Sequence, residues 1–164
     1  MDTVPQLTEK VGAAAVRSMS NQEVVIVYED FSTGLKAKRV FDELFGNYHL
    51  NMWEFKVLRL PALRAQAVRD ATSAAMVCLA AHGEDDLPTA VKEWVDRWSG
   101  ERAAHTSTLV VLVEAADAEL ASGTPMIESL RRAASQRGAG FFLGSIHAMN
   151  REEDSVCWET PNRL

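Results

Sequence analysis

The sequence predicts an α/β domain in which a doubly wound, five-stranded parallel sheet lies between two layers of helices. Five short apolar runs recur along 164 residues, and the segments between them carry apolar residues at helical spacing. Strands that alternate with helices form parallel sheets covered on both faces. The expected strands are Val24–Tyr28, Trp53–Leu60, Ala75–Ala81, Thr108–Val113 and Ala139–Leu143.

The first helix is expected after the first strand, and its apolar residues recur at intervals of three and four, which marks the face that packs on the sheet. These residues are Ala37, Val40, Phe41, Leu44 and Phe45. Within Trp53–Leu60, apolar residues alternate with charged ones. Such alternation predicts a strand with one polar face, near an edge of the sheet.

Prolines predict where the later helices begin. Pro61 suits the first position of the second helix, where the missing N–H costs nothing, and Pro88 opens the third. Thr124 is a suitable N-cap with Pro125 behind it, and Gly138 is expected to end that helix.

The remaining strands and one tryptophan pair fit this scheme. Ala75–Ala81 is apolar throughout and Thr108–Val113 nearly so, as expected of central strands buried on both faces. Trp94 and Trp98 lie one turn apart on the third helix, so we expect them to pack against the sheet.

Right-handed crossovers and the usual doubly wound order place the strands as 2-1-3-4-5. Residues 22–145 then form the single domain. Residues 1–21 are expected to be an N-terminal extension, and residues 146–164 a C-terminal tail packed on the domain.

Composition excludes several classes of partner. Lys and Arg number 17 against 23 Asp and Glu, a net charge of −6, which disfavours nucleic acid because phosphate binding needs clustered cations. No apolar run is long enough to cross a membrane, and residues 1–21 lack a secretory signal. Cys78 and Cys157 stand at no motif spacing, which favours a reducing, cytoplasmic compartment.

Two stretches resemble a known group of folds. Ile26–Tyr28, leading into Ser32-Thr33-Gly34, is similar to the phosphate loop of flavodoxins. Met76–Trp98 is similar to the flavodoxin third strand, its flavin-contacting loop and the following helix. The chain therefore resembles the flavodoxin-like folds, which include flavodoxins and the receiver domains of response regulators, over most of Glu23–Leu143.

The flavodoxin resemblance implies an FMN site. Ser32, Thr33 and Gly34 would offer backbone N–H groups and hydroxyls to the phosphate at a helix N-terminus, with Lys36 close by, and His82 would be the ring against the flavin. The alternative is that the three residues only form the cap of the next helix.

Two features weigh against FMN. Glu29 and Asp30 add negative charge beside the phosphate position. The loops after the third and fourth strands, His82–Leu87 and Glu114–Gly123, contain no Phe, Tyr or Trp to stack on a flavin. We therefore expect no cofactor and keep FMN as the alternative.

The receiver resemblance implies a magnesium site at Glu29 and Asp30, but the phosphorylation chemistry is missing. Ala80 and Ala81 stand where a receiver carries its phospho-accepting aspartate. Without a carboxylate nucleophile, aspartyl phosphorylation cannot occur there.

Topology predicts that polar residues after the strands share one edge of the sheet. They are Glu29, Asp30, His82, Glu84, Asp85, Asp86, Glu114 and Asp117. Three interpretations fit this set: solvated loop charges, a site for a divalent ion or a basic partner, and acid–base catalysis with His82 as the base.

The sequence favours a non-catalytic binding or regulatory module whose partner is another protein, with neither nucleic acid nor membrane as partner. It leaves self-association open. The alternative function is an FMN-binding electron-transfer protein or reductase.

Overall fold

The computed structural model describes residues 23–45, 47–83, 86–100, 107–114 and 123–146, and the backbone of 157–159. The predicted N-terminal extension and most of the predicted tail lie outside these residues. Among the described residues, no helix has the length and apolar character to cross a membrane.

The five-stranded parallel sheet is confirmed, with the order β2-β1-β3-β4-β5. A short sixth strand, which the sequence did not predict, pairs antiparallel with β5. The strands are β1 (Glu23–Tyr28), β2 (His49–Glu54), β3 (Met76–Ala81), β4 (Thr108–Val113), β5 (Gly140–Ser145) and β6 (Cys157–Glu159).

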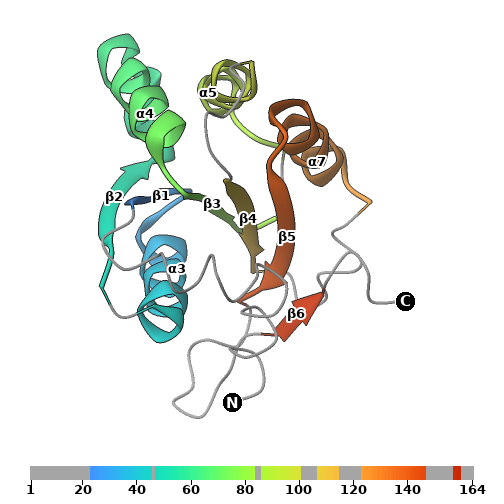
Figure 1. Ribbon diagram of the computed structural model, residues 1–164. Helices are drawn as coiled ribbons and strands as arrows, with labels where there is room; N and C mark the ends of the chain where they lie inside the picture. Colours follow the sequence, from blue (N-terminus) through green and yellow to red (C-terminus); the bar gives the residue numbers. More distant parts are fainter. Residues whose placement is uncertain are drawn as a thin grey trace.

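Helices cover both faces of the sheet, which gives the flavodoxin-like arrangement (Figure 1). Among the described helices, α3 (Phe31–Leu44) lies on one face. The other face carries α4 (Pro61–Ser73), α5 (Thr89–Ser99) and α7 (Pro125–Arg137).

The core divides into two layers because side chains alternate along each strand. In β1, Val24 and Ile26 join the layer under α3, whereas Val25 and Val27 join the layer on the opposite side. The second layer also holds Trp94 and Trp98, both fully buried, with ring centroids 6.4 Å apart and planes only 9° from parallel. Their predicted packing in the core is confirmed.

The helix boundary signals are mostly confirmed. Pro61 is the first residue of α4, and the Thr124 hydroxyl accepts the Ile127 N–H at 3.3 Å. Gly138 ends α7 with φ +82°, in the left-handed region that glycine enters most easily. Pro88 is the residue just before α5 rather than part of it.

The predicted second strand was wrong in its position. The strand is His49–Glu54, and most of the predicted range instead forms a 3-10 helix, η1 (Phe55–Arg59). Phe55 and Leu58 are its buried residues, and their spacing of three is the repeat of a 3-10 helix. The edge position was right, because β2 is the outermost strand on its side.

Candidate functional site

The turns that follow β1, β3 and β4 bring their polar side chains together, as the topology predicted. His82 Nε2 lies 2.6 Å from Asp30 Oδ2, and His82 Nδ1 lies 2.5 Å from Glu114 Oε1. The second oxygen of Glu114 pairs with the ammonium of Lys36 from α3. We call Asp30, Lys36, His82 and Glu114 the rim network.

Backbone hydrogen bonds fix the starting points of these turns. The Glu29 N–H donates to the Ala80 carbonyl at 2.9 Å, and the Glu114 N–H donates to the Ala81 carbonyl at 3.1 Å. The Glu29 carboxylate in turn accepts the His82 backbone N–H at 2.8 Å. The hydrogen bonds between neighbouring strands therefore continue into the turns from which the side chains of the rim network project.

Asp30 also caps α3. Its carboxylate accepts the Thr33 N–H at 3.0 Å, while the Thr33 hydroxyl accepts the Asp30 N–H at 3.0 Å. This reciprocal pair is a capping box. Ser32, Thr33 and Gly34, considered above as the cap, instead lie within the first turn of the helix.

The residues of the expected phosphate loop are only partly accessible. Thr33 is fully buried and Gly34 is buried, whereas Ser32 is exposed. The ring of Tyr28 covers Gly34 so closely that an added Cβ would lie 2.7 Å from its Cδ2 atom. The Asp30 carboxylate therefore occupies the N-terminus of α3, where a phosphate would have to bind.

The geometry around His82 favours its protonated form. Each ring nitrogen faces a carboxylate oxygen, and a neutral imidazole has one N–H while an imidazolium has two. The arrangement therefore favours the imidazolium form of the ring. The hydrogen bond to Asp30 is the main reason that the pKa of His82 is raised; burial opposes it, and Glu114 adds to it.

The two carboxylates are stabilised in their ionised form. Burial by itself would raise the pKa of Asp30, but hydrogen bonds from His82 and Thr33 outweigh it and lower that pKa. Burial likewise opposes the effect of Lys36 and His82 on Glu114, whose pKa is also lowered. When His82 is protonated, two negative and two positive groups balance within the rim network.

Asp86, another residue of the predicted acidic edge that the structure describes, does not join this network. Asp86 is exposed and pairs with Lys92 at 2.8 Å. Glu84, Asp85 and Asp117 lie outside the described residues. Within the described ranges, no group of three or more His, Cys, Asp or Glu side chains could hold a metal ion. Glu29 and Asp30 already accept hydrogen bonds from backbone and side-chain N–H groups. We therefore propose no metal site at these two residues.

An apolar surface beside the network was missed at the sequence level. Phe31, next to Asp30, is 78% exposed, and Leu35, one turn further along α3, is 39% exposed. We call these two residues the α3 apolar patch. The sequence did contain a signal, because Phe31 and Leu35 fall out of phase with the buried stripe that contains Ala37 and Phe41.

The chain matches no protein-family profile, and no curated protein matches it. Its function has therefore to be inferred from the chemistry of the site.

Proposed function

We propose that this domain is a non-catalytic binding module that docks another protein on the α3 apolar patch. The observation that carries this proposal is a 78% exposed phenylalanine beside a charge-balanced network. We expect it to act in the cytoplasm, in line with its cysteine content.

The exposure of Phe31 favours an interface. Covering a phenylalanine side chain contributes about 1.5–3 kcal/mol, and aromatic residues are common anchors of protein interfaces. Leu35 extends the apolar surface along the same face of α3, one turn away. A partner that buries both residues would gain more from them than from the neutralised rim.

The chemistry of the rim network favours binding over acid–base catalysis. A general base needs a free lone pair within reach of the substrate. Both ring nitrogens of His82 are engaged with carboxylates, and Glu114 is shared between His82 and Lys36. In this arrangement neither His82 nor Glu114 is poised to accept a proton from a substrate.

A comparative capture experiment tests the proposal. Wild-type protein, Phe31→Ser and Leu60→Ser serve as baits, and captured proteins are quantified by mass spectrometry. Leu60 is a matched control because it is 56% exposed and is the N-cap of α4, a helix on the opposite face of the sheet from α3. We expect a partner that Leu60→Ser retains and Phe31→Ser loses by about ten-fold or more. Equal capture by all three baits would contradict the proposal.

FMN binding is the second candidate, favoured by the flavodoxin-like strand order and by the exposed Ser32 in the first turn of α3. The Asp30 carboxylate at the helix N-terminus weighs against it, because that negative charge would repel a phosphate. An absorbance spectrum of protein purified from cells distinguishes the two. A flavin band near one equivalent per chain would replace the binding module with an electron carrier.

A further inference from the structure

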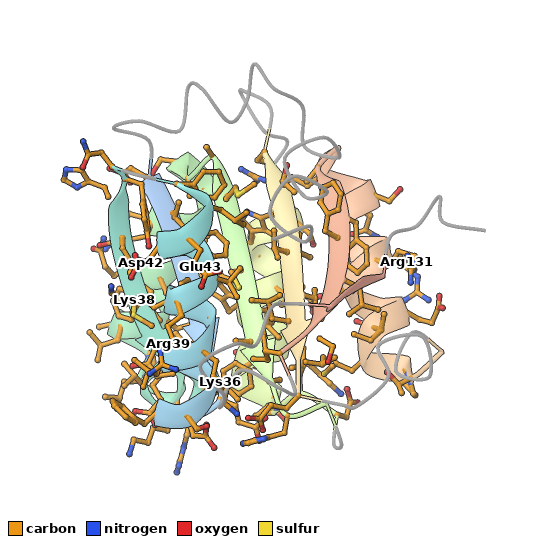
Figure 2. The ribbon with its side chains drawn as sticks, turned by 90° about the horizontal axis from the view of Figure 1, so that it is seen from below. Lys36, Lys38, Arg39, Asp42, Glu43 and Arg131 are labelled. Carbon is orange, nitrogen blue, oxygen red and sulfur yellow. The ribbon has the colours of Figure 1, made fainter. Side chains whose placement is uncertain are left out.

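The ring of His82 ties the first two turns of α3 to the ends of two central strands. Asp30 is the N-cap of α3, and Lys36 lies inside that helix. Through His82 and Glu114, these two residues are joined to the ends of β3 and β4. Figure 2 shows Lys36 toward one end of α3, with Asp42 and Glu43 farther along the helix.

The linkage depends on one proton. As an imidazolium, His82 donates one N–H to Asp30 and the other to Glu114. After deprotonation, one ring nitrogen carries a lone pair that faces a carboxylate oxygen at 2.5–2.6 Å. Two acceptors at that distance repel each other, so at least one of the two contacts has to open.

We propose that His82 is a pH-sensitive latch which, when protonated, holds the first turn of α3 and its apolar patch against the ends of β3 and β4. Deprotonation releases one carboxylate and loosens the position of Phe31, which follows Asp30 directly in the chain. The consequence for partner binding rests on the proposed function. A patch held in place binds more tightly than a loosened one, because less ordering is needed on binding.

The charged groups around the ring set the pH range of the latch. In the described residues they are Asp30 from the turn before α3, Lys36 from α3 and Glu114 after β4, with the Glu29 carboxylate on the His82 backbone N–H. Lys36 pairs with Glu114, and the hydrogen bonds from the ring to Asp30 and to Glu114 favour the imidazolium.

The dependence of stability on pH follows from the direction in which the pKa of each group is shifted. The folded-state pKa of His82 is raised above its ordinary value of 6.5. Its stabilising contribution is therefore fully present below pH 6.5 and is lost as the pH rises through the raised value. The pKa values of Asp30 and Glu114 are lowered from 3.8 and 4.5, so both carboxylates stay ionised over the range in which His82 titrates.

An NMR titration tests the latch without any partner. The ring signals of His82 and Phe31 are followed from pH 5 to pH 9 in the presence of a chelator, so that no metal ion contributes. We expect His82 to titrate above pH 6.5 and the Phe31 ring to change with the same midpoint. The latch would be overturned by a His82 midpoint at or below pH 6.5, or by a Phe31 signal that does not change at the His82 midpoint.

Variants separate the latch from general effects of pH. His82→Gln should remove the response of Phe31. Glu114→Gln keeps the histidine and should lower its midpoint, so the test stands even if His82→Gln does not fold. Asp42→Asn is the matched control on the same helix, because Asp42 bonds with Lys38 and Tyr48, and it should leave the midpoint unchanged.

Binding supplies the second measurement. For a partner captured through Phe31, we expect the affinity of the wild type to fall about three-fold or more between pH 6 and pH 8.5, and that of His82→Gln to stay constant. The absence of any Phe31-dependent partner would refute the proposed function while leaving the NMR result intact. A partner whose affinity changes equally in both proteins would refute the regulatory role of His82.

Discussion

Gly34 shows how one residue can satisfy a motif for a different physical reason. The phosphate-loop resemblance assigned it to a ligand, but its lack of a side chain makes room for the ring of Tyr28. An alanine within a helix is normally about 1 kcal/mol more favourable than glycine. Here an added Cβ would lie 2.7 Å from Cδ2 and 2.8 Å from Cγ of Tyr28. Gly34→Ala should therefore lower the free energy of unfolding by about 1–3 kcal/mol, measured by urea denaturation.

A second substitution identifies the cause of that loss. In a Tyr28→Val background the ring is gone, so Gly34→Ala should become neutral or stabilising. Gly34→Ala that stabilises the wild type would show that the ring yields easily, and that the glycine is not required by this contact.

The meeting of Asp30, His82 and Glu114 could be predicted from topology alone, because the carboxyl ends of parallel strands share one edge. Their pairing could not, since the direction of each side chain depends on the local turn. The Asp30–Thr33 capping box was readable as an acceptor three residues before a hydroxyl, close to the start of an apolar stripe. A helix cap was considered in this segment, but at Ser32, Thr33 and Gly34 rather than at Asp30.

At the scale of the helices, Arg137 joins three elements where they end. It is the last residue of α7 and is 2% exposed. Its guanidinium donates to the Trp98 carbonyl at 2.9 Å and to the Thr72 carbonyl at 3.0 Å, and it lies 5.0 Å from the centre of the Trp98 ring. Both carbonyls belong to the C-terminal turns of α5 and α4, where the helix dipole favours a positive charge.

Arg137→Met should therefore cost stability, because it leaves the carbonyls of Trp98 and Thr72 without these donors. We expect a loss of about 2–4 kcal/mol in the free energy of unfolding. Arg132→Met on the same helix is the control, since Arg132 is exposed and its loss should stay within about 0.5 kcal/mol. Equal losses in urea denaturation of the two variants would show that Arg137 contributes no more than a surface residue.

The element that sequence reasoning misplaced lies where two periodicities overlap. Trp53, Phe55 and Val57 alternate as in a strand, but Phe55 is already the first residue of η1. The true strand begins at His49, and its residues are mostly half-buried, so their pattern is weak. Central strands such as β3, buried along their whole length, were placed to within one residue because both faces require apolar side chains.

For the molecule as a whole, the order β2-β1-β3-β4-β5 places β3 in the middle of the parallel sheet. Cys78 lies in β3 between Ile26 of β1 and Val110 of β4, and its thiol is fully buried. Burial also raises the pKa of that thiol, which removes the thiolate needed for alkylation. Its reactivity should therefore report on opening of the whole sheet.

Thiol labelling in a Cys157→Ser background follows Cys78 alone, since the chain has two cysteines. Native protein should react at least about a thousand-fold more slowly than the unfolded chain, because a domain of ordinary stability is unfolded less often than that. Across a urea series, the labelled fraction should rise with the same midpoint as the far-ultraviolet circular dichroism signal. Labelling that precedes the loss of helix would mean that the central strand opens while its covering helices persist, so the two layers and the sheet would not unfold as one cooperative unit.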